Sequence, residues 1–458
     1  MERQGSRWQC GPRRRAWPVV PILVATLLLL AGCAASNRED ADGPGIPGTL
    51  PARPNIVIIL VDTLRADAVG FGGARRDTSP RLDAWARRGV VFEQATTPAG
   101  WTRTAVISLF TGLYPAAHGV QDKDHVAPDS LLTLAEVLRG AGWRTAAFVS
   151  NFAVAARFGT AQGFDTFRFF DKKEAPRGTP SKLNYLPIEF MDPEVRAFLE
   201  HPPAEPFFAY IHTTDPHFPY LPPPEYLHWG TEPRDRYDGE VLYTDRYVGE
   251  WLDAMKRSGV LGRSIVVFTA DHGEEFHEHG GTGHGVTVFE ECVRIPLVVW
   301  APGLRPGRRR SLVSLVDVPP TLLEAAHVPA PEGFAVEGRS LWPMIAGGDP
   351  GNGWNWNYSE LVYPSKGIAF TYREGDEKVV HIVRDKLGRR DWSGLYDVSR
   401  DPFQQRNLAA ERPDRLRELR EKLRAIRRDH LREAQAVANP RPLDGEALEQ
   451  LRSLGYVD

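Results

Sequence analysis

Three apolar runs, each followed at once by acidic or histidine side chains, limit what this chain can fold into. The runs cover residues 55–61, 206–212 and 264–270, and most of their side chains are apolar. Such runs are typical of strands buried on both faces, as in a parallel sheet covered by helices. Because ligands bind beyond the carboxyl ends of strands in open α/β sheets, we expect the residues after the runs to meet in one crevice.

The residues that follow the three runs are chemically suited to hold a metal ion. Asp62 follows the first run, Asp215 and His217 follow the second, and Asp271 and His272 follow the third. One acid after a strand is common, because polar residues often begin loops, whereas three together favour a metal site. Carboxylate and imidazole ligands suit Ca, Mn, Mg or Zn, and these ligand types do not choose among them.

Residues 102–111 are predicted to form a helix that begins at Thr102. Val106 and Leu109 recur at helical spacing, and Gly112 follows as a C-terminal stop. A hydroxyl at a helix start faces unpaired N–H groups and the positive end of the helix dipole, which favours an alkoxide or a bound oxyanion. Thr102 is therefore a candidate nucleophile, with an ordinary N-cap as the alternative interpretation.

Further helices and strands alternate along the chain, and the pattern changes after residue 302. Helices are predicted at 79–86, 131–138, 238–256, 316–323 and 413–434, and strands at 90–92, 144–150 and 296–300. Residues 358–396 alternate in the manner of a small antiparallel sheet. The predicted fold class is α/β, with a mixed, largely parallel sheet flanked by helices and a small C-terminal antiparallel sheet plus a helix.

The N-terminal residues have the features of an export signal. Basic residues 13–15 precede an apolar run at 19–30 that is short for a membrane span, and the tetrad at 30–33 is LAGC. This tetrad resembles a bacterial lipobox, which implies a signal peptide over residues 1–32, a lipid on Cys33 and a tether over residues 33–53. We expect a membrane-anchored lipoprotein, in the periplasm on the outer membrane if the source is Gram-negative. A plain signal peptide or an uncleaved anchor is the alternative.

Composition describes an ordinary globular chain. The 458 residues carry a net charge of −3 and are 42% hydrophobic, so nothing suggests a nucleic-acid partner. Of the three cysteines, Cys10 would leave with the signal and Cys33 would carry the lipid. Cys292 then has no partner for an intramolecular disulfide.

Five sequence motifs occur in order along the chain. They are NIVIILVDTLR at 55–65, LFTGLYPAAHG at 109–119, DPHFPY at 215–220, DHGE at 271–274 with GGTGHG at 280–285, and LYDVSRDPFQQRNL at 395–408. Together they resemble the sulfatase family of the alkaline phosphatase superfamily over nearly the whole mature chain. The resemblance implies a sulfatase-like catalytic domain over residues 54–350 and a C-terminal subdomain with a terminal helix over residues 351–458.

The resemblance also implies a metal site and a nucleophile. One divalent cation would lie on Asp62, Asp271 and His272, with the nucleophile Thr102 as its fourth protein ligand. Such a cation lowers the pKa of the hydroxyl and draws charge from the transferring group.

Two histidines are implied to contact the substrate. His217 matches a family histidine at the substrate oxyanion or leaving group, and His284 matches a family lysine with the same task. Histidine can donate a hydrogen bond or protonate a leaving alkoxide. Weaker candidates, which we expect to be structural or to support the site, are His118, Asp215, His277 and His279. A second metal on Asp215, His217 and His284 is considered, but Pro219 stands where the superfamily's histidine would be, so one metal is favoured.

The chain departs from the family at residues that carry the chemistry. Thr102 stands where most sulfatases have a Cys or Ser that becomes formylglycine, and threonine cannot form that aldehyde, so no formylglycine is expected. Thr63 stands at a family aspartate, and Ser150 and Phe152 stand at a family lysine and histidine. Threonine nucleophiles occur in relatives that transfer phosphoryl groups. Arg103 is expected at the surface.

The sequence therefore predicts a metal-dependent hydrolase that cleaves or transfers a sulfate or phosphate ester through Thr102. The ester would belong to a small molecule, a glycan or a lipid head group. The alternative is a sulfatase-fold lipoprotein that binds an anionic glycan or lipid without turnover. Loops at 172–192 and 222–235 are expected to form the pocket walls.

Overall fold

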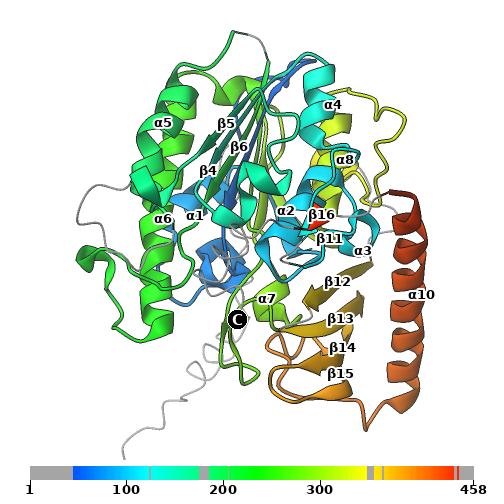
Figure 1. The fold of residues 1–458 in the computed structure, drawn as a ribbon. Helices are drawn as coiled ribbons and strands as arrows, with labels where there is room; N and C mark the ends of the chain where they lie inside the picture. Colours follow the sequence, from blue (N-terminus) through cyan, green and yellow to red (C-terminus); the bar gives the residue numbers. More distant parts are fainter. Residues whose placement is uncertain are drawn as a thin grey trace, which may run out of the picture. The chain divides into compact units, whose positions relative to one another are not determined.

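The computed structural model describes residues 45–122, 125–174, 185–204, 206–347, 355–363, 366–437 and 441–442. A mixed eight-stranded sheet forms the centre of this part of the chain. The strand order is β11-β2-β10-β7-β1-β6-β4-β5 (Figure 1). The strands are β1 (Asn55–Val61), β2 (Val90–Thr96), β4 (Arg144–Val149), β5 (Thr166–Phe169), β6 (Phe207–Thr213), β7 (Ser264–Thr269), β10 (Leu297–Trp300) and β11 (Gly307–Ser314).

The apolar runs form the middle of this sheet, as predicted. Strand β1 is buried along its whole length and lies parallel to both β6 and β7, with Ile56 opposite Phe208 and Ile265. Strand β10 runs antiparallel to β7 and β2, so the sheet is largely but not wholly parallel. The parallel register places the ends of β1, β6 and β7 at one edge of the sheet.

Helices cover both faces of the sheet. In Figure 1, α5 and α6 lie on one side with α1, whereas α2, α4 and α8 lie on the other. The helices are α1 (Pro80–Ala86), α2 (Thr102–Thr111), α3 (Pro115–His118), α4 (Leu134–Gly140), α5 (Ile188–Glu200), α6 (Pro233–Arg257), α7 (Glu290–Val293), α8 (Val318–Ala325) and α9 (Trp342–Ile345). Short 3-10 helices are Ala66–Ala68, Gly70–Gly72, Phe152–Val154, Ala156–Phe158, Lys172–Glu174, Pro224–Tyr226, Leu261–Arg263 and Leu315–Asp317. The short strands β3 (His125–Val126) and β16 (Arg441–Pro442) pair, as do β8 (Glu275–Phe276) and β9 (Thr282–Gly283).

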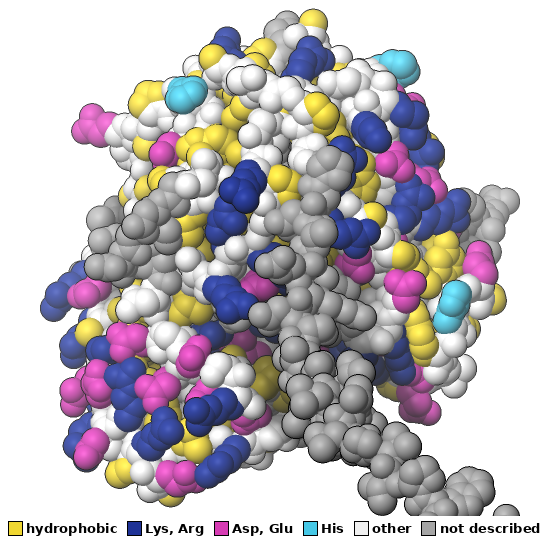
Figure 2. Space-filling model, turned by 180° about the vertical axis from the view of Figure 1, so that it is seen from behind, with side chains coloured by type: hydrophobic (Ala, Val, Ile, Leu, Met, Phe, Trp, Pro, Cys, Tyr) yellow, Lys and Arg dark blue, Asp and Glu magenta, His cyan; other side chains and the backbone are white. Residues whose placement is uncertain are grey.

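The predicted C-terminal antiparallel sheet and helix are both present. The sheet consists of β12 (Trp356–Tyr363), β13 (Gly367–Glu374), β14 (Glu377–Asp385) and β15 (Arg390–Asp397). Helix α10 (Pro413–Val437) packs on this sheet through the buried Leu419 and Leu423. Figure 2 shows basic and acidic side chains interspersed over this part of the molecule, and Arg415 pairs there with Glu374 and Glu377 at 3.0 and 2.7 Å. The charged face of α10 is therefore a solvated face of a packing helix.

The small sheet is fastened to the segment that leads into α2. The Glu360 N–H donates to the Pro98 carbonyl at 2.9 Å, and the Ser359 hydroxyl donates to the Thr97 carbonyl at 2.6 Å. These bonds bring the C-terminal subdomain to the helix that begins with Thr102.

The N-terminal predictions fall largely outside the described residues. The signal peptide, Cys33 and most of the tether precede residue 45, so export and lipidation stay predictions. The last part of the expected tether packs on the domain instead of hanging free, because Ile46 is buried and its carbonyl accepts from the Gly303 N–H at 3.0 Å. None of the described helices has the length and apolarity needed to cross a bilayer.

Candidate active site

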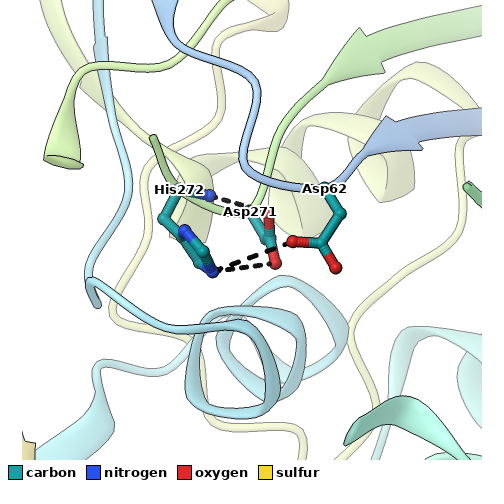
Figure 3. Close-up of side chains that lie close together, drawn as sticks. All are labelled: Asp62, Asp271 and His272. Carbon is teal, nitrogen blue, oxygen red and sulfur yellow. Dashed lines mark hydrogen bonds and ion pairs between the residues drawn. The ribbon is translucent and has the colours of Figure 1, made fainter. Parts of the chain in front are cut away.

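Asp62, Asp271 and His272 meet at the carboxyl edge of the large sheet (Figure 3). Asp62 follows β1 directly, and Asp271 and His272 follow the neighbouring strand β7. His272 Nε2 lies 3.4 Å from Asp271 Oδ2 and 3.9 Å from Asp62 Oδ1, and one ligand atom from each residue lies within 4.8 Å of the others. All three side chains are fully buried.

The charges of this cluster fit a divalent cation. Burial raises the pKa of Asp62, and burial together with the charge of Asp62 raises the pKa of Asp271 to about 6. Within the described residues, Asp62 Oδ1 and Asp271 Oδ2 are buried without a hydrogen-bond partner. Two such carboxylate oxygens facing each other are costly unless a positive charge lies between them. A cation held by these oxygens and His272 Nε2 would remove that cost.

Asn151 and His212 orient the Asp62 carboxylate, and the sequence interpretation missed both. The Asn151 amide donates to Asp62 Oδ2, while its own oxygen accepts from the Ala153 N–H at 2.6 Å. His212 Nε2 lies 3.4 Å from the same Oδ2, and the Tyr210 hydroxyl is hydrogen-bonded to His212 Nδ1 at 2.9 Å. Oδ2 is thereby occupied and Oδ1 is left toward His272.

Asn151 and His212 could have been identified from the sequence by their positions near strand ends. Asn151 follows the end of β4, and His212 is the second-last residue of β6, at the same edge of the sheet as the cluster. Burial lowers the pKa of His212 to about 4, so this side chain is neutral.

Thr102 is beside the cluster, at the first position of α2. Trp101 is the N-cap residue, so Thr102 is not the cap that the alternative interpretation proposed. Its Oγ1 lies 3.1 Å from His272 Nε2. His272 Nδ1 lies 2.9 Å from the Gly273 carbonyl and donates to it, so Nε2 presents a lone pair to Thr102 and to the cluster.

His217 and His284 join the same buried group. The ring centroid of His284 lies 4.5 Å from that of His272 and 4.9 Å from that of His217. His284 Nδ1 donates to Glu274 Oε1 at 3.0 Å, and His217 Nδ1 donates to the Phe218 carbonyl at 2.7 Å. Burial lowers the pKa of both histidines, so each is a neutral hydrogen-bonding ring. The structure thus brings together all six residues to which the sequence gave catalytic or metal-binding roles, which are Asp62, Thr102, His217, Asp271, His272 and His284.

The weaker candidates lie outside the cluster. Asp215 Oδ2 accepts from the Ile188 N–H at 2.7 Å at the start of α5. No group of potential metal ligands among the described residues includes Asp215, so the structure gives no support to a second metal on Asp215, His217 and His284. His118 is held between Ser108 and the Val120 N–H.

A second group of potential ligands, Glu275, His279 and Glu291, is better explained as an ion pair. His279 Nδ1 lies 2.7 Å from Glu291 Oε1 and Nε2 lies 3.2 Å from the Gln404 carbonyl. Both ring nitrogens therefore donate, which requires the charged imidazolium. Burial opposes this charge, but the contact with Glu291 raises the pKa of His279. His277, the remaining weak candidate, is exposed.

Arg103 is buried, so the prediction of a surface arginine is wrong. Its Nε donates to the Ala153 carbonyl at 3.0 Å, and its guanidinium carbon lies 3.5 Å from the centre of the Phe158 ring. The planar guanidinium packs on this ring. Cys292 is buried and is a free cysteine. Residues 175–184 of the expected pocket wall lie outside the described part of the chain.

The mixed sheet and the cluster define a class of enzymes. In this class a hydroxyl at the start of a helix lies beside buried side chains that can bind a metal ion, and the enzymes hydrolyse ester bonds. A family model described as sulfatase matches residues 54–328, and one described as N-sulphoglucosamine sulphohydrolase, C-terminal, matches residues 279–429. The chain belongs to the sulfatase family. It is accordingly a hydrolase of ester bonds, and the alternative of a binding protein without turnover is not favoured.

Curated relatives share the family over most of their length. An ulvan-active sulfatase from Formosa agariphila is 26% identical in an alignment of 403 positions that covers 78% of this chain and 77% of the relative. An N-acetylgalactosamine-6-O-sulfatase from Bacteroides thetaiotaomicron is 22% identical in an alignment of 511 positions that covers 88% of this chain and 98% of the relative.

Solved structures share the fold. A structure bound to its substrate D-glucosamine-2-N,6-O-disulfate aligns with a TM-score of 0.69 at 18% identity, over 82% of this chain and 98% of that one. The phosphonate monoester hydrolase of Agrobacterium radiobacter aligns with a TM-score of 0.67 at 21% identity, over 83% and 96% of the two chains.

Proposed function

We propose that this protein hydrolyses a sulfate ester of a sulfated glycan or sugar, with Thr102 as the nucleophile and one divalent cation. The observation that carries the proposal is the Thr102 hydroxyl, 3.1 Å from His272 Nε2 in a buried group of metal-capable residues. Relatives whose names include ulvan and N-acetylgalactosamine support the class of substrate.

Asp62 Oδ1, Asp271 Oδ2, His272 Nε2 and Thr102 Oγ1 are the atoms that would hold the cation. Ca, Mn, Mg and Zn all suit these ligands. When bound, the cation lowers the pKa of the Thr102 hydroxyl and offsets charge on the sulfate oxygens.

The residues of the chain then have separate tasks. Sulfate oxygens lie against the N–H groups at the start of α2, which favour an anion. His217 and His284 take up a proton on Nε2 when the anionic ester binds, because its charge raises their pKa, and in that form they donate hydrogen bonds to the remaining oxygens and to the leaving alcohol. Glu274 and the Phe218 carbonyl hold Nδ1 of these rings, so that Nε2 of each is directed to the ester.

Covalent transfer through Thr102 balances in two steps. In the first step the Thr102 oxygen loses its proton and bonds to sulfur, the bond from sulfur to the alcohol oxygen breaks, and the alcohol oxygen takes up one proton. In the second step water attacks the same sulfur and the bond from sulfur to the Thr102 oxygen breaks. One proton of the water passes to the Thr102 oxygen, and sulfate leaves. No aldehyde is needed, in agreement with a threonine at this position.

Hydrolysis or transfer of a phosphate ester is the second candidate, and the observation that favours it is the threonine itself. Thr102 cannot become formylglycine, whereas a threonyl phosphate is a sensible intermediate that water or another hydroxyl can open. Turnover of 4-nitrophenyl sulfate, 4-nitrophenyl phosphate and a phenyl phosphonate, with Mn, Ca, Mg or Zn supplied, separates the two candidates.

Substitution of Thr102 tests the nucleophile. We expect Thr102→Ala to lower kcat by at least about 10³-fold, because the attacking oxygen is removed, and Thr102→Ser to retain part of the activity. Thr111→Ala is the matched control, since Thr111 lies on the same helix and bonds only locally, to the Ile107 carbonyl at 2.8 Å and the Leu113 N–H at 3.2 Å. Full turnover by Thr102→Ala on every ester that the wild type cleaves would exclude this nucleophile.

A further inference from the structure

The turn between β12 and β13 brings Lys366 of the C-terminal subdomain to the candidate active site. The Lys366 N–H donates to the Tyr363 carbonyl at 2.8 Å, and Lys366 Nζ lies 5.2 Å from the centre of the Tyr363 ring. That ring stacks on Trp101 with the centroids 5.4 Å apart and the planes 10° from parallel. Trp101 directly precedes Thr102, so the lysine lies beside the start of α2.

Gly285 places Lys366 against the His284 loop. A Cβ atom at Gly285 would lie 3.7 Å from Lys366 Nζ and 3.6 Å from Trp101 Cβ. The Gly285 N–H donates to the Gly100 carbonyl at 2.8 Å, which ties this loop to the residues before α2. Gly367, the first residue of β13, agrees, because a Cβ atom there would lie 3.6 Å from the Val286 carbonyl oxygen. Lys366 and Gly367 are thus neighbours of the two residues after His284.

Lys366 lies beside the loop that carries His284 and is half-buried. The guanidinium of Arg103, by contrast, is buried against the Phe158 ring.

We propose that Lys366 is a substrate-binding residue that pairs with a second negative charge, on the alcohol part of the substrate. This inference rests on the proposed function, in which the cluster and the start of α2 hold the sulfate that is cleaved. Lys366 lies beyond His284, the residue assigned to the leaving oxygen, and therefore faces the alcohol part. Carboxylate and sulfate groups both form charge-assisted hydrogen bonds with an ammonium group, so the second anion is a uronate carboxylate or a second sulfate.

Three substrates and two variants test the inference. The substrates are a monosulfated neutral sugar, the same sugar with two sulfates and a monosulfated uronic acid, and the variants are Lys366→Gln and Lys366→Arg. We expect Lys366→Gln to raise KM about tenfold for one or both doubly charged substrates. The kcat and the KM for the neutral sugar should stay unchanged, and Lys366→Arg should restore KM. Whichever doubly charged substrate responds identifies the anion as carboxylate or sulfate. Lys386→Gln, an exposed lysine in the β14–β15 turn, is the matched control.

A binding measurement separates failure of this inference from failure of the proposed function. In calorimetric titration, Lys366→Gln should bind the doubly charged sugars more weakly than the wild type and the neutral sugar equally well. This loss of affinity should appear whether or not turnover occurs. If the wild type binds the doubly charged sugars with this dependence but cleaves none, the proposed function fails and the role of Lys366 stands. Equal affinities of wild type and Lys366→Gln, or equal losses on all three sugars, overturn the role of Lys366.

Discussion

Single atoms of buried polar side chains decide what the candidate site can bind. Asp62 shows this, because Asn151 and His212 engage Oδ2 while Oδ1 stays unbonded toward His272. A buried carboxylate whose second oxygen lacks a partner is unfavourable in an empty site and favourable beside a cation. The two histidines His272 and His279 differ in the same way. His272 keeps a lone pair on Nε2 for a cation, whereas both ring nitrogens of His279 donate hydrogen bonds and have no lone pair to offer.

His118 makes the fold sensitive to acid. Its Nδ1 accepts from the Val120 N–H at 3.1 Å, and its Nε2 is hydrogen-bonded to Ser108 Oγ at 3.0 Å. Burial lowers its pKa from 6.5 to about 3, because the charged imidazolium would lose its hydration there. The unfolded chain takes up a proton below pH 6.5 and the folded chain does not, so stability falls as pH falls from there toward 3.

We therefore expect His118 to lower the free energy of unfolding by about 2 kcal/mol between pH 7 and pH 5. His118→Asn keeps an acceptor for Val120 but cannot titrate, so urea unfolding of this variant should depend less on pH over this window, even if the variant is less stable at pH 7. An unchanged pH dependence in His118→Asn would show that this histidine is not responsible.

Helix α2 is the element on which the site depends, because it carries Thr102 and is fixed at both ends. At its start, Trp101 stacks on Tyr363 of the small sheet. At its end, Gly112 has a φ of 72°, and the Gly112 carbonyl accepts from the Glu337 and Gly338 N–H groups at 2.9 and 3.1 Å. The position of Thr102, the proposed nucleophile, thus depends on contacts to segments far along the chain.

Gly112→Ala should disturb this helix end. A Cβ atom there would lie 2.8 Å from Val336 Cγ1, and the left-handed conformation is unfavourable for alanine. We expect a loss of about 1–3 kcal/mol in the free energy of unfolding, with lower turnover, measured by denaturant titration and ester hydrolysis. Gly140→Ala is the control, because nothing lies within 4 Å of a Cβ at Gly140 and its φ is not left-handed. Equal effects of the two substitutions would contradict the role of the Gly112 conformation.

In the molecule as a whole, the two parts of the chain meet at the candidate site. The large sheet carries Asp62, Asp271 and His272, while the small sheet is bonded to the segment before Thr102 and carries Lys366, the proposed substrate-binding residue. A cation bound between buried carboxylates should therefore stabilise the whole fold as well as the site.

Metal removal should lower both activity and thermal stability. After treatment with a chelator, we expect loss of turnover and a lower Tm, and recovery of both when Ca, Mn, Mg or Zn is added back. At a concentration of a hundred times Kd, the gain is about 2.7 kcal/mol. Asp271→Asn should abolish the shift in Tm, whereas Glu291→Gln, at the ion pair with His279, should retain it. An absent shift in the wild type with all four metals, or an equal shift in Asp271→Asn, would contradict the assigned ligands.

Local patterns in the sequence were sufficient for the elements and for placing Asp62 at a strand end and Thr102 at a helix start. The run that forms β1 predicts a buried strand because its side chains cannot face water, and Asp62 must then lie at the end of that strand. The spacing of Val106 and Leu109 and the stop at Gly112 predict α2 because helical periodicity is a property of neighbouring residues. The antiparallel sheet of the C-terminal subdomain follows from the same kind of pattern.

Only the tertiary structure decided which distant groups meet. The burial of Arg103 depends on the ring of Phe158, and the orientation of Asp62 depends on residues at the ends of β4 and β6. The position of Lys366 depends on the packing of the small sheet, which is far from Thr102 in the sequence. Sequence by itself determined the fold class, the strand ends and the hydroxyl at the helix start, since these follow from local periodicity. The contacts that orient those groups were decided by long-range packing, because hydrogen-bond partners are selected by distance in space and leave no periodic signal along the chain.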